Sequence, residues 1–388
     1  MAVLSRRVDE LPRSFTMGLP SAARAMLAEG LEVSVLRAGQ PDFNTPPHIV
    51  EAAIAALETG KTTYGPPAGI PALRGAIARK LRRENRLRYE SEAVVVTNGA
   101  KQALFNLMQV LLEPGDEVII PAPYWLSYPH MVHLAGGKPV IVATDKATGC
   151  RMTPDQLQQA ITPRTRLVIF NSPSNPTGVV YTPAEVRAIA EVIVSADVKV
   201  VSDEIYEHIL YDEAKHLSIG SIDPEVMART ITVNGLSKAY AMTGWRVGYV
   251  AAPLQIAQAV TTLQGHSTSN VCTFAQYGAI AALEGPQDFL LAMRRTFAER
   301  RRMVIKLLDD IPGLTYMRPD GAFYVWVDIS QTGLGSEVFC DRLLTEAQVA
   351  AVPGIAFGAD DHIRLSYAVS KETLESGLAG LNQFMHRR

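Results

Sequence analysis

The chain has 388 residues, of which 47% are hydrophobic and 20% are charged, a composition typical of a globular protein with a sizeable core. Its net charge of −2 provides no basic field of the kind that attracts nucleic acid or an anionic membrane. Three scattered cysteines form no metal or disulfide pattern, and no apolar run reaches the roughly 18 residues of a membrane span. We therefore expect a cytoplasmic protein that binds neither nucleic acid nor a membrane.

Short apolar segments alternate with helical patterns in the first two thirds of the chain. One helical pattern covers residues 100–112, and another helix is expected after Thr182, an N-cap residue that precedes Pro183. The predicted strands are residues 93–97, 117–123, 166–170, 198–202 and 230–234. Strands that are apolar along their whole length and separated by helices are typical of a mostly parallel sheet covered on both faces.

The pattern changes in the last quarter of the chain. A long basic helix is predicted at residues 287–308, with its charged side solvated. Segments with strand character follow at residues 321–329, 349–354 and 362–370. We therefore predict an α/β fold with a large domain at residues 46–285 and a smaller α+β domain formed by residues 1–45 with 286–388.

Polar residues follow the carboxyl ends of four predicted strands, where open parallel sheets bind ligands. They are Asn175 in the turn-rich NSPSNPTG, Asp203 with Tyr206, Ser237 with Lys238, and Gly99 with Ala100 at a helix start. Unpaired N–H groups at a helix N-terminus favour a phosphate. No strand end carries GxGxxG or a Walker lysine, so the sequence does not indicate a dinucleotide or ATP site.

Lys238 and Arg246 belong to one stretch, NGLSKAYAMTGWRVGY, in which the lysine lies among small and apolar residues. Such a setting lowers the pKa of a lysine, as Schiff-base chemistry near neutral pH requires. Arg246, between Gly244 and Gly248, is suited to bind a phosphate with two parallel hydrogen bonds. A carboxylate such as Asp203 would keep a pyridine nitrogen protonated. Together these residues suit pyridoxal phosphate, whereas singly each has a plainer interpretation as a turn, a helix cap or a solvated lysine.

Whole motifs extend this pattern along the chain. AGQPDFNTP, YGPPAGIPALR, PAPYWLSYP, NSPSNPTG, SDEIYEH, GLSKAYAMTGWRVG and HIRLSYA occur in this order. In these motifs the chain resembles the fold-type-I, class I pyridoxal-phosphate aminotransferases, and most resembles the bacterial aspartate aminotransferases. The resemblance covers essentially the whole chain. It implies a seven-stranded type of mostly parallel sheet, a homodimer, and pyridoxal 5'-phosphate as the cofactor.

The resemblance also assigns the catalytic residues. Lys238 would hold the cofactor as a Schiff base and then carry the proton between the substrate Cα and the cofactor. Asp203 would pair with the pyridinium nitrogen and so strengthen the electron sink. Tyr206 and Asn175 would hydrogen-bond the cofactor's phenolate oxygen.

Binding roles follow from the same resemblance. Trp125 would stack beside the cofactor ring, and Tyr64 would reach the phosphate of the neighbouring subunit, which implies active sites shared across a homodimer. Arg364 would bind the substrate α-carboxylate as a bidentate fork, with a backbone contact from Gly39. The residues expected to grip the phosphate are Gly99, Ala100, Ser237 and Arg246.

Lys101 carries the inference about the substrate. Aspartate and oxaloacetate have a second carboxylate, and in the branch that this chain resembles a lysine of the NGAK motif binds it, at a helix start that also favours an anion. Alternatively, Lys101 is a second phosphate contact or a solvated lysine. We predict amino-group transfer from aspartate to 2-oxoglutarate by a ping-pong path. The alternatives are a broader or different specificity, for glutamate, prephenate or aromatic substrates, and a carbon–sulfur β-lyase on the same fold.

Prephenate is a separate question of substrate. Some relatives that accept it carry a Lys-Pro pair where this chain has Pro12 and Arg13. This departure puts prephenate activity in doubt, although Arg13 or Arg166 could supply charge nearby. Thr16 and residues 265–270 are expected to line the same pocket.

Two other kinds of site are not favoured. His130 and His208 have no second ligand at metal spacing, so we predict structural or surface histidines and no metal site. The basic run at residues 293–303 is interpreted as a solvated helix face, because no wider basic surface accompanies it.

Overall fold

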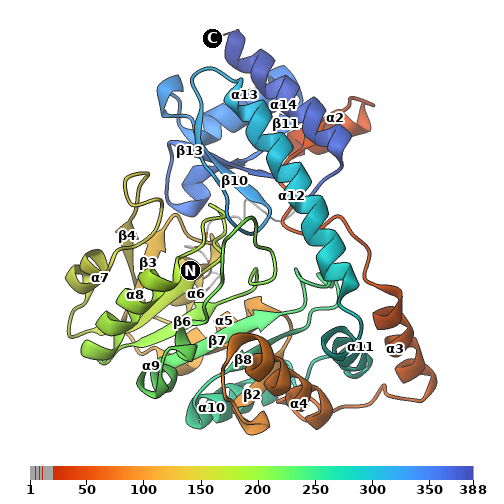
Figure 1. Ribbon diagram of the computed structural model, residues 1–388, viewed down its shortest axis with the longest axis vertical. Coiled ribbons are helices and arrows are strands. Elements are labelled where there is room, and N and C mark those ends of the chain that lie inside the picture. The colour runs from red at the N-terminus through yellow and green to blue at the C-terminus, as the bar shows by residue number, and fades with distance from the viewer. Residues whose placement is uncertain (1–4, 6–7, 9–10, 12–20, 388) are drawn as a thin grey trace.

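The structure is a computed structural model that describes residues 5, 8, 11 and 21–387. The predictions about Pro12, Arg13 and Thr16 lie outside the described residues. Figure 1 shows a large sheet surrounded by helices in the lower part of the view and a smaller part above it, with the long helix α12 (Asp288–Asp309) running between them. Within the described residues, no helix is long and apolar enough to cross a membrane.

The large sheet has seven strands in the order β2-β8-β7-β6-β5-β3-β4. Their bounds are β2 Val94–Thr97, β3 Glu117–Ala122, β4 Lys138–Ala143, β5 Thr165–Asn171, β6 Lys199–Asp203, β7 Thr230–Gly235 and β8 Gly248–Ala251. Neighbours from β7 to β4 pair in parallel, and only β8 runs antiparallel to its neighbours β2 and β7. The mostly parallel seven-stranded sheet is therefore confirmed, while β4 and β8 are strands that the sequence analysis did not predict.

Helices surround this sheet, and several begin at residues that the sequence marks as starts. Thr182 caps α8 by accepting a hydrogen bond from the Glu185 backbone, the Glu185 side chain bonds back, and Pro183 takes the first helical position. The helices of the large part are α3 Pro47–Glu58, α4 Pro71–Lys80, α5 Ala100–Leu111, α6 Ser127–Leu134, α7 Pro154–Ala160, α8 Pro183–Ser195, α9 Pro224–Arg229, α10 Leu254–Gly265 and α11 Thr273–Glu284.

The inner strands are buried on both faces, because alternate residues of a strand point to opposite sides. Val118 and Ile120 of β3 join an apolar cluster with residues of α5, α6 and α10. Ile119 between them joins a second cluster with residues of α7, α8 and α9. A third cluster packs α3, α4 and α11 against β2 and β8. Helices therefore cover both faces of the sheet, as the apolar strands predicted.

The smaller part contains an antiparallel sheet in the order β12-β13-β10-β9. The bounds of its elements are β9 Thr315–Met317, β10 Tyr324–Asp328, β12 Val352–Pro353, β13 His362–Ser366, α13 Ser336–Ala347, α14 Lys371–His386 and α2 Ser21–Ala28. β1 (Ser34–Val35) pairs in parallel with β11 (Val349–Ala350), so the N-terminal segment joins the C-terminal one. The exact domain bounds stay a prediction.

Short helical segments complete the chain: η1 Leu81–Asn85, η2 Ser91–Ala93, η3 Ile219–Ser221, η4 Ser330–Thr332 and η5 Gly354–Phe357. One prediction about α12 is wrong. Arg301, in its basic run, is not solvated but 1% exposed, because its guanidinium donates to the Pro319 carbonyl and to Asp212 at 2.9 Å. Its neighbour Arg300 forms a two-pronged ion pair with Asp42.

Candidate active site

A cavity of about 770 Å³ opens at the carboxyl ends of the parallel strands, where the predicted site residues gather. Its lining comes from the loops after β3, β5, β6 and β7, from the starts of α5 and α6, and from the smaller part with the segment before α3. The predicted residues that line it are Gly39, Ala100, Lys101, Trp125, Asn175, Asp203, Tyr206, Ser237, Lys238, Arg246 and Arg364. Gly99 lies directly beside the lining. Tyr64, Arg166 and residues 265–270, which were also expected at or near the pocket, do not line it.

Lys238 follows β7 and extends into this cavity, where its Nζ donates a hydrogen bond to the Gly39 carbonyl. Burial, followed by the positive charges of Arg364 and Arg246, lowers the pKa of Lys238 to about 7, although Asp203 opposes the shift. A substantial fraction of the lysine is therefore the neutral amine near neutral pH. This is the form that attacks an aldehyde.

Asp203 ends β6 and is buried at 4% exposure. Burial raises the pKa of its carboxyl to about 6, while hydrogen bonds from the Tyr128 hydroxyl and the Ile205 backbone act in the opposite direction. The Tyr128 bond to Oδ2 is 2.7 Å long. A buried carboxylate oriented in this way is suited to pair with a cationic ring nitrogen. This ion pair would offset the solvation that the carboxylate loses on burial.

Arg364 lies on β13 with 1% exposure, and neighbouring groups fix its guanidinium. Nη1 donates to Asn175 Oδ1 at 2.9 Å, and Nη2 donates to the Arg37 carbonyl at 3.2 Å. The guanidinium carbon lies 4.3 Å from the centre of the Tyr324 ring, and the Tyr324 hydroxyl lies 2.9 Å from that of Tyr206. Among the described residues, Nε has no hydrogen-bond partner. A buried cation with an unpaired donor at a cavity is suited to bind a carboxylate.

An anion cradle forms where α5 begins. Gly99 caps the helix with a φ of +81°, and a Cβ there would lie 2.5 Å from Nη2 of Arg246. Arg246 itself donates to the carbonyl of Thr243 at 2.8 Å and to that of Asn98 at 3.3 Å. The close approach of the guanidinium to the helix N-terminus concentrates N–H donors and positive charge at one point. With Ser237 alongside, this donor set fits a phosphate.

Gly248 keeps this cradle closed, because a Cβ there would lie only 2.3 Å from the Ala100 nitrogen. We expect Gly248→Ala to push β8 and α5 apart, to destabilise the fold by about 1–3 kcal/mol and to weaken cofactor binding. Gly244→Ala is the matched control, since a Cβ at Gly244 meets nothing within 4 Å. Thermal unfolding and cofactor titration of both variants test the expectation, and equal behaviour of the two would contradict it.

Lys101 and Trp125 form the side of the cavity next to this cradle. The Lys101 ammonium lies 5.1 Å from the centre of the Trp125 indole, within cation–π range. Burial, with a further contribution from Arg246, lowers the pKa of Lys101. Lys101 is solvent-exposed and its side chain is not ion-paired with any carboxylate among the described residues. It is therefore a cation of the cavity wall and available to an anionic ligand.

Several cavity residues were not predicted. Tyr128 and Asn171 lie inside motifs that the sequence analysis quoted, so their association with the site was visible although their roles were not. Tyr324 lies in the predicted strand 321–329. Its position at the active site becomes clear only from the structure, in which it contacts Tyr206 and Arg364. Tyr64 is 90% exposed and does not reach the cavity of its own chain. Its predicted role across a dimer stays a prediction.

A lysine that loses its proton near neutral pH, a buried carboxylate and a phosphate cradle meet at one cavity. Together they define an α/β enzyme built around a phosphorylated cofactor with a ring nitrogen. Pyridoxal phosphate fits this set, with Lys238 for its aldehyde, Asp203 for its ring nitrogen and the α5 cradle for its phosphate.

Comparisons with known proteins agree. The family model for aminotransferases of class I and II matches residues 32–381. A Geobacillus stearothermophilus protein named aspartate aminotransferase is 48% identical over 390 residues, and a Cereibacter sphaeroides protein named aspartate/prephenate aminotransferase is 47% identical over 395; each match covers 99% of both chains. A solved structure of the Thermus thermophilus aspartate aminotransferase with maleate superposes with a TM-score of 0.95 at 45% identity, covering 99% of this chain and 100% of that one.

The chain therefore belongs to the aminotransferase class I and II family. It is an aminotransferase, and enzymes of this family depend on pyridoxal 5'-phosphate.

Proposed function

We propose that this enzyme transfers the amino group of L-aspartate to 2-oxoglutarate, giving oxaloacetate and L-glutamate in two half-reactions. The observation that carries the proposal is that the buried Arg364 and the exposed Lys101 line the same cavity as Arg246, which we assign to the phosphate. A four-carbon dicarboxylate needs one cation for each carboxylate. The names of full-length relatives and the maleate in a solved relative support the same substrate class.

Each residue has a role that follows from its surroundings. Arg364 binds the α-carboxylate with its fork, which Asn175 and the Arg37 carbonyl hold in one orientation. Lys101 binds the second carboxylate beside Trp125. These two contacts orient the amino acid so that its Cα–H bond faces Lys238, whose neutral amine accepts the proton and later returns it.

The cofactor, when bound, supplies an electron sink that stabilises negative charge at the substrate Cα. Asp203 keeps the ring nitrogen protonated, and Tyr128 holds the Asp203 carboxylate in place. Tyr206 and Asn175 would donate hydrogen bonds to the phenolate oxygen of the cofactor, and Trp125 would stack against its ring. The phosphate is bound by Gly99, Ala100, Ser237 and Arg246, with Lys101 close by.

The assembly is proposed to be a homodimer in the cytoplasm, with Tyr64 of one subunit at the phosphate of the other. Its 90% exposure within the single chain supports this role, because a large aromatic side chain at a solvated position is typical of an interface.

Lys101→Ala tests the substrate. We expect kcat/KM for aspartate to fall by about tenfold to hundredfold, because a charge-assisted hydrogen bond contributes about 1.5–3 kcal/mol. kcat/KM for alanine, which has no second carboxylate, should stay within about twofold of its wild-type value. Lys101→Arg, which keeps the charge, is the control and should retain most activity towards aspartate. Equal losses on aspartate and alanine would remove the basis for a dicarboxylic substrate.

Prephenate is a second candidate amino acceptor, favoured by the aspartate/prephenate relatives. Prephenate also carries two carboxylates, so Arg364 and Lys101 suit it as well. Turnover with prephenate as the acceptor, measured in parallel with 2-oxoglutarate, decides between a narrow and a broad acceptor specificity.

A further inference from the structure

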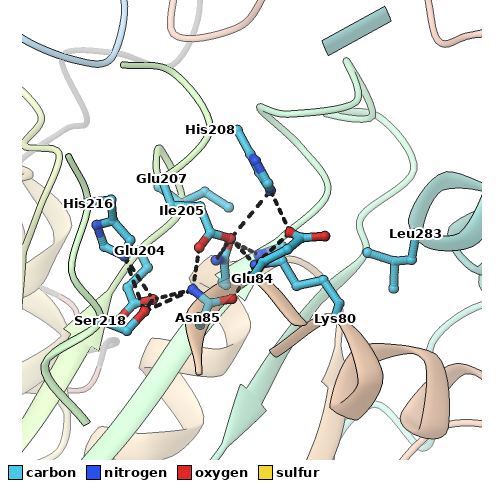
Figure 2. A network of polar contacts seen from close by, with 12 residues as sticks. Lys80, Glu84, Asn85, Glu204, Ile205, Glu207, His208, His216, Ser218 and Leu283 are labelled. Atoms are coloured by element: carbon cyan, nitrogen blue, oxygen red, sulfur yellow. Dashed lines mark hydrogen bonds and ion pairs between the residues drawn. The ribbon is translucent and has the colours of Figure 1, made fainter. Parts of the chain in front are cut away.

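A buried polar network lies behind the active-site turn that follows β6 (Figure 2). It joins η1, the turn, the segment before η3 and the end of β7. Its members are Lys80, Asn85, Glu204, Glu207, His216, Ser218 and Asn234, which we call the buried network. All are 8% exposed or less except His216, which is partly buried.

The turn after β6 divides its side chains between two compartments. Asp203 and Tyr206 line the active-site cavity. Glu204 and Glu207, each one residue further on, point into the buried network, as Figure 2 shows. The two glutamates of the buried network are therefore adjacent in sequence to the two residues that face the cofactor.

Glu207 forms the centre of the network. Its Oε1 accepts hydrogen bonds from the Lys80 ammonium and from Asn234 Nδ2 at 2.6 Å, and its Oε2 accepts from Asn85 Nδ2 at 2.5 Å. Burial acts to raise the pKa of Glu207, but Lys80, His208 and His216 lower it to about 2. Burial likewise acts to lower the pKa of Lys80, but Glu207 and Glu84 raise it. Both partners stay charged, so this is a buried ion pair whose remaining bonds are satisfied.

The network has the spacing of a metal site, since ligand atoms of Glu204, Glu207 and His216 lie within 4.8 Å of one another. However, the Lys80 ammonium already supplies a cation to Glu207, and the Asn85 amide donates to both glutamates. An internal ammonium takes the place of a metal ion, and the network connects parts of the protein instead of binding a ligand.

Asn234 is the connection from this network to the catalytic lysine. While its Nδ2 donates to Glu207, its Oδ1 accepts from the Gly235 N–H at 2.7 Å. Gly235 is the last residue of β7 and lies three positions before Lys238. The backbone N–H of Glu204 donates to the Val233 carbonyl at 2.9 Å, so the β6 turn is also bonded to β7 at the residue directly before Asn234.

We propose that Asn234, anchored by the Lys80–Glu207 ion pair, is a positioning residue that sets where Lys238 lies relative to Asp203. The inference rests on the proposed function, in which these two residues bind opposite ends of the cofactor ring system. Lys238 contacts the cofactor, whereas Asn234 acts only through the backbone of the loop before it. Losing this connection leaves both side chains present but lets their separation vary.

The test compares Asn234→Ala with Ser218→Ala. Ser218 donates to Glu204 at 2.7 Å in the same network, yet it has no bond to the loop before Lys238, so it is the matched structural control. Three quantities are measured on each protein: the thermal unfolding midpoint, the Kd of pyridoxal phosphate for the cofactor-free protein, and the pH midpoint at which the absorption band of the bound cofactor changes.

We expect Asn234→Ala to raise that Kd by about tenfold or more and to move the pH midpoint by about half a unit or more. Ser218→Ala should lower only the unfolding midpoint. Should Asn234→Ala not fold, Asn234→Asp takes its place, because it retains an acceptor for Gly235 but repels Glu207.

The inference is overturned if the Asn234 variant and Ser218→Ala lose stability alike while the Kd and the pH midpoint stay at wild-type values. Failure of the proposed function gives a different result, since the wild-type protein would then bind no pyridoxal phosphate or would fail to convert it with aspartate.

Discussion

Lys238→Ala loses amino-group transfer, with turnover expected to fall by at least about 10⁴-fold, because one side chain supplies both the amine that holds the cofactor and the base that moves the Cα proton. Burial and the neighbouring Arg364 and Arg246 lower the pKa of Lys238 to about 7. Turnover with aspartate and 2-oxoglutarate is measured on protein supplied with pyridoxal phosphate.

Two control variants test whether the loss is specific to the amine of Lys238. Lys238→Arg keeps the positive charge but cannot release a proton near neutral pH, so it should be as inactive as the alanine variant. Lys101→Ala removes a different cation of the same cavity and should leave turnover with alanine close to that of the wild type. Substantial turnover in Lys238→Ala would contradict the assigned mechanism, whichever substrate is used.

Arg364→Ala should lower kcat/KM for every amino acid, in contrast to Lys101→Ala. Arg364 is fixed by Asn175, the Arg37 carbonyl and the Tyr324 ring, so its fork is ready for the carboxylate that all amino acids share. Truncating one partner of a buried, hydrogen-bonded charge pair costs about 2–5 kcal/mol, which corresponds to a loss of about thirtyfold to several thousandfold.

Arg364→Lys separates charge from geometry in this experiment. A lysine restores the positive charge but not the two parallel hydrogen bonds. The loss of kcat/KM in Arg364→Lys should therefore be smaller than in Arg364→Ala, but still measurable. Aspartate and alanine are compared for both variants, with the unfolding midpoint as a check on the fold. A loss confined to aspartate would mean that Arg364 binds the second carboxylate and that the two cations have exchanged roles.

The sequence predicted the fold where local pattern and tertiary structure agree. Strands β2, β3, β5, β6 and β7 were predicted because each contains a short apolar run, as is typical of strands whose two faces are covered by helices. β4 lies at the sheet edge, where its residues are exposed or only half-buried, and β8 is four residues long and begins with Gly248. Such strands have too weak a pattern to be predicted alone, since partners elsewhere in the chain define them.

The residues of the candidate site that belong to local motifs could be predicted from the sequence. Asp203 ends a strand, and Lys238 and Arg246 lie in a loop between two strands, so their meeting follows from sheet topology. Arg301 was misjudged because a charged run gives no sign of which side chain finds buried acceptors. The Lys80–Glu207 pair joins residues 127 positions apart, and no local pattern could have indicated it.

One measurement tests the central claim most directly: the absorption spectrum of the wild-type protein with pyridoxal phosphate, recorded before and after aspartate is added, with alanine in a parallel sample. We predict a band of lysine-bound cofactor that gives way to the pyridoxamine phosphate band, and faster with aspartate than with alanine. A protein that shows no such band, or whose band aspartate leaves unchanged, would contradict the claim that Lys238, Arg364 and Lys101 form an aspartate aminotransferase site.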